Sequence, residues 1–151
     1  MASDVVYDAI KDYLTVQWTL SPVQWPNEPQ IDTTDPTTRG DPNNPARPAP
    51  WVLFQITGTL YAQETIGAAS QAANRWDEAG LIWLHVVVPA GTGGTIVRRH
   101  AKALADLFRG TTLLSGSLMF GDARLGEGQP GNVDGSEYMV SVSIDWQYIE
   151  A

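Results

Sequence analysis

The sequence predicts an α+β fold in which a mostly antiparallel β-sheet of four to five strands packs on two helices. Two segments repeat apolar residues at helical spacing, and three others alternate or are continuously apolar, as strands are. Eight of the ten prolines lie between residues 22 and 50, which indicates a long Pro-rich arm. The predicted order is helix, arm, strand, strand, helix, strand, strand, and this order favours a sheet covered by both helices on one face.

The first helix is predicted over residues 4–18. Its apolar residues fall on one face at helical spacing, and they are Val5, Val6, Ala9, Ile10, Tyr13 and Leu14. Ser3 is a suitable N-cap, and the acidic first turn suits the positive end of the helix dipole. Pro22 closes the segment.

Residues 32–49 are predicted to form a long, exposed, Pro-rich arm. Proline at this density excludes a regular helix and a central strand, because it removes backbone N–H donors. The length of 151 residues is that of one domain, so we expect a single domain over residues 1–151 that includes this arm.

Two strands are predicted after the arm. Residues 51–61 place alternate apolar side chains on one face, and residues 80–88 form a nearly unbroken apolar run that predicts a buried central strand. Residues 62–79, which lie between them, fit either a hairpin arm or a short helical turn.

The second helix is predicted over residues 95–109, with Gly110 as the glycine that commonly follows a helix end. Its apolar stripe consists of Ile96, Val97, Ala101, Leu104, Leu107 and Phe108. Residues 117–124 are compatible with a strand. Residues 137–149 alternate most regularly, with large apolar side chains at even positions, and predict the last strand.

Composition restricts the possible functions. The formal net charge of −8 argues against a general nucleic-acid-coating role. The chain has no cysteine, which excludes disulfides, thiolate metal sites and cysteine nucleophiles. It has no apolar run of about 18 residues and no signal-peptide core, so we expect an intracellular protein without a membrane span. Charged residues make up only 17%, which indicates that part of the surface meets other protein.

No motif identifies a catalytic, cofactor-binding or metal-binding residue. The loop 91–95 lies where helix N-termini hold phosphates, but Ile96 stands where a dinucleotide motif requires glycine, so a connecting turn is preferred. His85 and His100 have no partner at metal-ligand spacing and fit core or surface histidines. Four carboxylates near a Gly-rich turn lack the order of a calcium loop and fit a solvated hairpin tip; they are Asp122, Glu127, Asp134 and Glu137.

The second helix concentrates positive charge in an acidic chain. Its basic residues are Arg98, Arg99, Lys102 and Arg109, and its one acidic residue is Asp106. They form either a solvated helix face or a basic patch that meets an acidic patch on a neighbouring copy. A head-to-tail contact between unlike surfaces closes into rings.

The six tryptophans allow two interpretations as well. Trp18, Trp25 and Trp51 flank the Pro-rich stretch and suit an interface, where tryptophan is favoured. Trp83 and Trp146 lie on predicted strands and are expected to fill the core.

Four motifs follow one another along the chain. They are VQWPNEP at residues 23–29, GLIWLHVVVP at 80–89, ALADLFRG at 103–110, and GEG at 126–128 before the strand that ends in DWQY at 145–148. In this order and spacing the chain resembles the tail terminator proteins of long-tailed bacteriophages, also described as tail completion or tail-to-head joining proteins. The resemblance covers nearly the whole chain, and the long arm at 32–49 departs from it.

The resemblance implies a structural virion protein and no enzymatic activity. Members of this family assemble as a ring, typically a hexamer, on the head-proximal end of the tail tube. The ring stops tube polymerisation and forms the docking surface for the head connector, or neck protein, while DNA passes through the lumen without specific binding. No cofactor, metal or membrane is implied. The protein would be made in the bacterial host cytoplasm and reside in the virion tail.

The resemblance and the charge pattern together give candidate interface residues. These are Trp25, Asn27, Glu28, Arg98, Arg99, Lys102, Arg109 and Glu127. The arm and the tip at 126–136 are also expected to contact neighbours. Because a basic lumen would retard DNA, we expect the basic helix to pack on the sheet and to face neighbouring subunits or the outside.

Two alternative functions stay open. One is a neck, head-completion or tail tube subunit; tube proteins usually need long hairpins, and the sequence indicates at most one convincing strand pair. The other is a small ligand-binding or enzymatic domain that uses the 91–95 loop.

Overall fold

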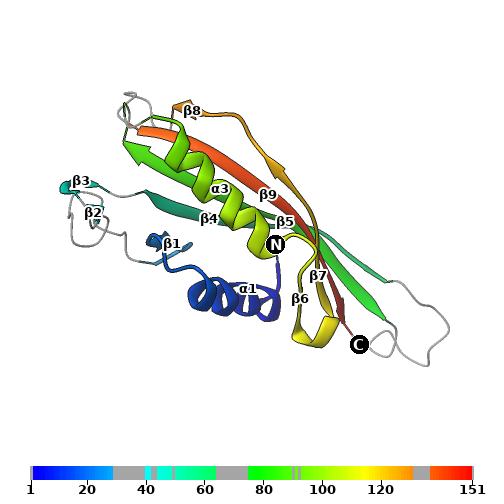
Figure 1. The fold of residues 1–151 in the computed structure, drawn as a ribbon. Coiled ribbons are helices and arrows are strands. Elements are labelled where there is room, and N and C mark those ends of the chain that lie inside the picture. The colour runs from blue at the N-terminus through cyan, green and yellow to red at the C-terminus, as the bar shows by residue number, and fades with distance from the viewer. Residues whose placement is uncertain are drawn as a thin grey trace.

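The computed structural model describes residues 2–28, 40–41, 44–48, 50–63, 75–89, 91, 93–130 and 137–150. In this part of the chain, a curved sheet carries both helices on the same face (Figure 1). The predicted α+β fold and the predicted order of the main elements are therefore confirmed. Of the described helices, none is long and apolar enough to cross a membrane.

Helix α1 spans Asp4–Gln17 and helix α3 spans Thr95–Phe108, each within one residue of its predicted bounds. Gly110 ends α3 as predicted, with a left-handed φ of 66°. Val5 and Ile96 were predicted to join the apolar stripes, but they are 46% and 47% exposed. Each precedes a fully buried residue by about 100° of helix rotation, which turns its side chain out of the contact with the sheet.

The main sheet has seven strands in the order β1-β4-β5-β9-β7-β6, with β8 paired to β9. Its centre consists of three long strands: β4 (Trp51–Gln63), β5 (Trp76–Pro89) and β9 (Glu137–Glu150). The remaining strands are β1 (Val23–Gln24), β6 (Thr112–Leu113), β7 (Leu118–Leu125) and β8 (Gln129–Pro130). Only β1 pairs in parallel, with β4, so a mostly antiparallel sheet is confirmed, and the short strands raise the number above the predicted four to five.

Part of the predicted arm is described. Strands β2 (Gly40–Asp41) and β3 (Asn44–Pro48) form a separate antiparallel pair. This pairing was not predicted from the prolines, but it does not make either segment a central strand. The rest of the predicted arm, residues 32–39, 42, 43 and 49, lies outside the described residues. A short 3₁₀ helix, η2 (Leu114–Gly116), joins β6 to β7.

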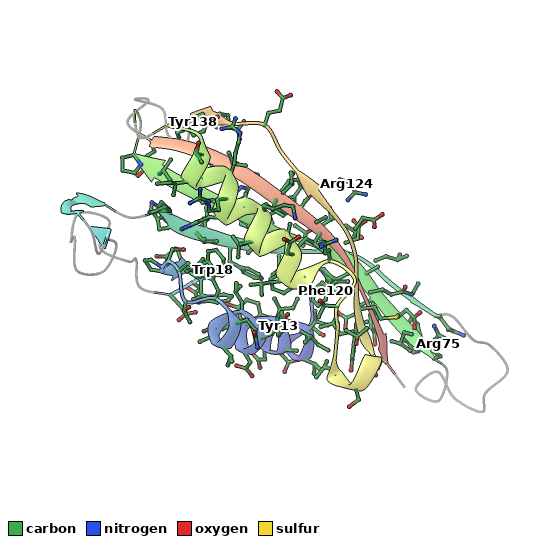
Figure 2. All side chains as sticks on the ribbon, in the orientation of Figure 1. Tyr13, Trp18, Arg75, Phe120, Arg124 and Tyr138 are labelled. Atoms are coloured by element: carbon green, nitrogen blue, oxygen red, sulfur yellow. The ribbon has the colours of Figure 1, made fainter. Side chains whose placement is uncertain are left out.

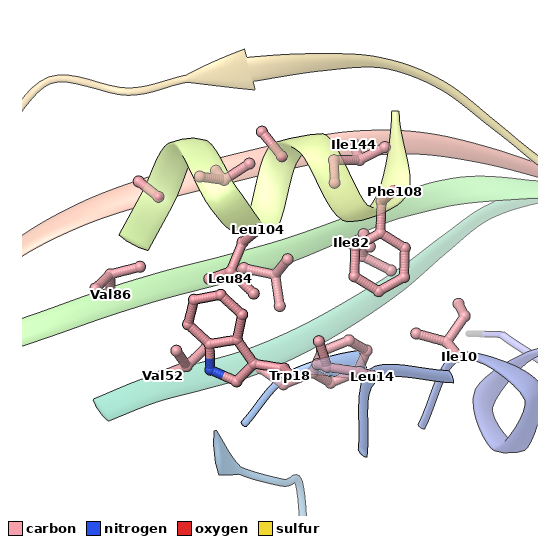
Figure 3. Close-up of a cluster of buried hydrophobic side chains, with 14 of the residues drawn as sticks. Ile10, Leu14, Trp18, Val52, Ile82, Leu84, Val86, Leu104, Phe108 and Ile144 are labelled. Carbon is pink, nitrogen blue, oxygen red and sulfur yellow. The ribbon is translucent and has the colours of Figure 1, made fainter. Parts of the chain in front are cut away.

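The hydrophobic core lies between the sheet and the two helices. The register aligns Ile56 with Ile82, and Ile82 with Ile144, so even-numbered side chains of the long strands share the helix-covered face; in β4 this holds up to the bulge after Gly58, beyond which Tyr61 pairs with Glu78. Helix residues such as Leu14, Leu104 and Phe108 complete the core, together with Trp18 (Figure 3). Each fully buried aliphatic or aromatic side chain contributes about 1.5–3 kcal/mol.

The far ends of the three long strands run beyond both helices (Figure 1). We call this part the overhang; it comprises residues 60–63, 76–79 and 147–150. Gln63 pairs with Trp76, so the hairpin-arm interpretation of residues 62–79 is confirmed where the chain is described, and residues 64–74 lie outside that part. β4 and β5 together form a long hairpin, so the helical-turn alternative for residues 62–79 is wrong where the chain is described.

Candidate functional site

The first candidate segment, residues 23–28, is held between α1 and β4. Trp25 is half-buried, with its ring centroid 4.8 Å from that of Phe54 and 6.5 Å from that of Tyr7. The ammonium of Lys11 lies 5.5 Å from the centroid of the Trp25 ring. Trp25 was predicted to be an interface residue, but its side chain also stabilises the fold through these contacts within the chain.

Glu28 and Asn27 complete this segment. Nζ of Lys11 lies 2.6 Å from Oε2 of Glu28, and this hydrogen bond is the main reason why the pKa of Lys11 is raised. Asn27 is exposed and has a φ of 56°, in the left-handed region that asparagine tolerates better than most residues. Trp25 and Glu28 thus fix the turn, and Asn27 stands at its surface.

The basic side chains of α3 are exposed, since the opposite side of the helix is buried against the sheet. Arg98 donates from Nη1 to the carbonyl oxygen of Gly94 at 3.2 Å and from Nη2 to the hydroxyl of Tyr138 at 3.3 Å. Arg99 is exposed as well, and it forms no ion pair with any other residue of the described part.

The positive charge at the end of α3 is partly compensated by one carboxylate. Nζ of Lys102 and Nε of Arg109 each lie 2.8 Å from Oδ1 of Asp106. The hydrogen bond from Lys102 is the main reason why the pKa of Asp106 is lowered. The uncompensated positive charge of the helix is therefore concentrated in its first turns, at Arg98 and Arg99.

Glu127 is exposed in the turn between β7 and β8. The glycines beside it lie close to β9. The N–H of Gly126 donates to the carbonyl oxygen of Ser141 at 2.7 Å, and a Cβ on Gly128 would lie 1.4 Å from the hydroxyl of Tyr138. Because Tyr138 also accepts from Arg98, this turn meets the start of α3 (Figure 2). The structure thus brings Glu127 and Arg98 to one region and keeps Trp25, Asn27 and Glu28 at α1 and β4.

The sequence did not predict a groove that lies between the start of α1 and the overhang. Its volume is about 380 Å³. Among the described residues that line it, three are carboxylates, those of Asp4, Glu78 and Glu150, and none is basic. The remaining lining residues are Ser3, Val5, Tyr61 and Tyr148. We call this site the acidic groove.

Glu78 connects the acidic groove to α1. The side chain is only 5% exposed, and its Oε1 accepts the backbone N–H of Ser3 at 2.9 Å. Ser3 occupies the N-cap position but makes no side-chain cap, so this part of the prediction is wrong. A carboxylate from β5 takes the stabilising position at the positive end of the helix dipole instead. The buried Ser3 hydroxyl has no hydrogen-bond partner among the described residues.

Glu150 lines the groove from β9, which is the strand next to the β5 strand that carries Glu78. It accepts the hydroxyl of Tyr61 at 2.5 Å, and this hydrogen bond raises the pKa of Tyr61 to about 12. The Tyr61 ring stacks on Trp76 with centroids 5.3 Å apart. The sequence did not predict the groove, because the adjacent carboxylates of Asp77 and Glu78 are typical of a loop. The signal that could have shown a strand here is the alternation of Trp76, Glu78 and Gly80, which continues the alternation of β5 toward its start.

Odd-numbered side chains of the long strands form a second unpredicted surface, which we call the open sheet face. Its half-buried apolar side chains are Trp51, Leu53, Leu81, Trp83 and Met139, and Val87 on the same face is buried. Trp83 is half-buried here, with its ring stacked 6.1 Å from that of His85, so it does not fill the core as expected. The helices cover only the other face, on which Trp146 is 2% exposed and fills the core as predicted.

His85 cross-links the three central strands on the open sheet face. Its Nε2–H donates to Oε1 of Gln55 at 2.8 Å, and its Nδ1 accepts from the Ser141 hydroxyl at 2.6 Å. Burial lowers the pKa of His85, which favours the neutral ring that this arrangement uses. The histidine is thus held by hydrogen bonds, in line with its assignment to a core or surface role.

The other candidates for chemistry are dispersed. Across the described ranges, no three His, Asp or Glu side chains lie close enough to hold a metal ion, and Asp134 is outside those ranges. His100 packs edge-on against Trp18, 5.5 Å between centroids, and its pKa is lowered by burial and by Arg99. Gly91 and Gly93 have left-handed φ values of 84° and 86°, which suit a connecting turn.

Both a protein family and a solved structure match nearly the whole chain. The sequence model of a family described as phage tail terminator protein matches residues 5–146. A solved structure aligns with 100% of this chain and 97% of its own, with a TM-score of 0.58 and 19% sequence identity, which shows a common fold. Among curated protein sequences, none matches the chain.

Proposed function

Because the chain belongs to the phage tail terminator protein family, we propose that it forms a ring on the head-proximal end of the tail tube. Membership gives it a structural role in the virion tail, in association with tail and head components. In this proposal the ring is a homohexamer that stops tube polymerisation and forms the docking surface for the head connector. DNA passes through its lumen without specific binding.

The observation that carries the proposal is the family match over residues 5–146. The open sheet face supports it physically, because Trp51, Leu53 and Trp83 lie on a face that no described helix covers. These apolar side chains are half-buried and alternate with Gln55, His85 and Ser141 on the same face, and apolar surface that no helix covers is a candidate interaction site. A ring that stacks on a tube needs contacts to its neighbours and to the tube, and this face provides apolar surface for them.

Termination requires two different surfaces. The exposed end of a tube offers unpaired subunit surface that accepts the next ring. A terminator must match this surface on one side and present a different surface on the other, so that no further tube subunit adds. Contacts between unlike surfaces of identical subunits close into a ring when the rotation between subunits permits it.

The charges suit a lumen through which DNA passes. With a net charge of −8, the protein repels the phosphate backbone. We propose that the exposed basic residues of α3 face neighbouring subunits or the outside; these residues are Arg98, Arg99, Lys102 and Arg109. Asn27 and Glu127 are exposed and remain proposed contacts, whereas Trp25 and Glu28 would act by holding the turn that presents Asn27.

The test is electron microscopy of tube protein from the same phage, polymerised with and without this chain. We expect the chain to shorten the tubes in proportion to its concentration and to leave a cap at one end. Tube lengths that do not change at any ratio would contradict the proposal.

A tail tube subunit is the second candidate, and the long β4–β5 hairpin favours it. The expectation of at most one convincing strand pair was wrong, so the lack of hairpins no longer counts against this alternative. Gold labelling of a tagged chain on assembled tails separates the two candidates. A terminator is labelled at one end, and a tube subunit is labelled along the whole length.

A further inference from the structure

The acidic groove has the properties of a docking site for a positively charged side chain. Its three carboxylates outweigh the positive end of α1, which corresponds to roughly half a charge. Val5 and Tyr61, which are 46% and 54% exposed, add apolar surface beside the charges. The Ser3 hydroxyl, which is buried and has no hydrogen-bond partner within the described chain, belongs to a residue that lines the groove.

The first turns of α3 carry the complementary surface. Arg99 is exposed, and Ile96, three residues earlier and therefore on the same side of the helix, is 47% exposed. The N-terminal end of the helix adds to the positive potential. Charge and apolar surface thus occur side by side, as they do in the groove.

The two surfaces lie at opposite ends of the molecule. Arg98 contacts Tyr138 near the start of β9, and Tyr148 lines the acidic groove near its end. Ten residues of extended strand separate these tyrosines, which corresponds to about 33 Å. This distance exceeds the screening length of about 8 Å at physiological salt, so the charges do not compensate each other within one chain.

We propose that the acidic groove of one copy receives the first turns of α3 from the next copy, with Arg99 directed to the carboxylates of Glu78 and Glu150. Ile96 then packs on Val5 and Tyr61. This inference rests on the proposed ring and names the surfaces that join its subunits. Each copy uses its groove at one end and its helix at the other, so the contact is heterologous and repeats around a closed ring.

Charge reversal tests the contact. Glu150 is chosen over Glu78, because Glu78 also holds the start of α1. Arg99→Glu and Glu150→Arg should each weaken self-association, measured by sedimentation velocity at low salt, by about tenfold or more. The chain that carries both substitutions should recover most of the association, since the pair is restored with reversed sign. Arg124→Glu is the control for charge reversal away from the contact: Arg124 is exposed on β7, where it pairs with Asp145, and its reversal should leave association unchanged.

Cross-linking provides a second measurement, because the chain has no cysteine of its own. Arg99→Cys mixed with Glu150→Cys should give a dimer with a short bismaleimide, and Arg124→Cys mixed with Glu150→Cys should not. If rings form but neither reversal weakens them, the inference is wrong and the proposed function stands. If the wild-type chain associates neither in solution nor on tube ends, both are wrong.

Discussion

At the scale of single residues, close packing determines which positions tolerate change. Gly80 lies in β5 where β4 forms a bulge between Gly58 and Leu60. A Cβ on Gly80 would lie 1.9 Å from the carbonyl oxygen of Thr57 and 2.8 Å from the Trp146 ring. The glycine therefore permits the bulge and the burial of Trp146 at the same place, where the sheet leaves the helices.

We expect Gly80→Ala to destabilise the fold by about 1–3 kcal/mol, because the backbone of Thr57 cannot move away cheaply. Chemical denaturation measures the change. Gly121→Ala is the control, because its Cβ would meet nothing closer than 3.7 Å. Equal stabilities of the two variants would show that the contact at Gly80 relaxes without cost.

Trp25→Ala is expected to lower the free energy of unfolding by about 2 kcal/mol, since the side chain packs between Tyr7 and Phe54. Asn27→Gly is expected to be nearly neutral, because glycine accepts the φ of 56° without strain. Thermal or chemical unfolding of both variants distinguishes a structural role of Trp25 from a purely intermolecular one. Wild-type stability of Trp25→Ala would favour the intermolecular role.

At the scale of elements, α1 and α3 support each other on the sheet. The Tyr13 hydroxyl donates to the carbonyl oxygen of Leu107 at 2.7 Å, and the Tyr13 and Phe108 rings meet edge to face at 5.3 Å. Trp18 covers His100 at the other end of this contact. The two helices therefore form one layer, and a change of charge at His100 acts on both.

Acidification should destabilise this layer. Burial lowers the pKa of His85 and His100 from the ordinary value of 6.5, so the unfolded chain binds protons at a higher pH than the folded chain does. The histidine contribution is complete above the unfolded pKa and is lost as the pH falls through the folded values. We expect the denaturation midpoint to decrease as the pH falls below about 6.5, and His100→Gln to reduce that slope. An unchanged slope in His100→Gln would contradict this role of His100.

The elements that the sequence predicted are those with a strong period and one clear burial environment. Both helices, the even-numbered face of β9 and Gly110 belong to this group. The short strands were not predicted, and the strand residues at 76–79 were not assigned to one structure. Both depend on pairing partners that are distant in sequence. Glu78 illustrates this. The local sequence favours a loop there, but pairing with β4 and β9 makes Glu78 a strand residue, and its carboxylate then contacts the start of α1.

The candidate residues show the same limit. The charge pattern identified the basic side of α3 correctly as exposed, but it did not show that Lys102 and Arg109 both pair with Asp106. The acidic groove combines residues from α1, β4, β5 and β9, and no spacing along the chain brings them together. A surface assembled from four elements is visible only when the register of the sheet is known.

At the scale of the whole molecule, the sheet separates a helix-covered side from an uncovered side. Both helices cover one face of the sheet, and the open sheet face carries apolar side chains on the other (Figure 1). The acidic groove and the start of α3 add complementary charges at opposite ends. In the proposed ring, the charged surfaces would join neighbouring subunits and the open sheet face would be free for stacking on the end of a tube.

The copy number per virion tests the central claim most directly. Quantitative mass spectrometry of purified tails should give one hexameric ring of this chain per tail, and the same number in tails of different length. A copy number that increases with tail length would contradict terminal placement and would make the chain a component of the tube.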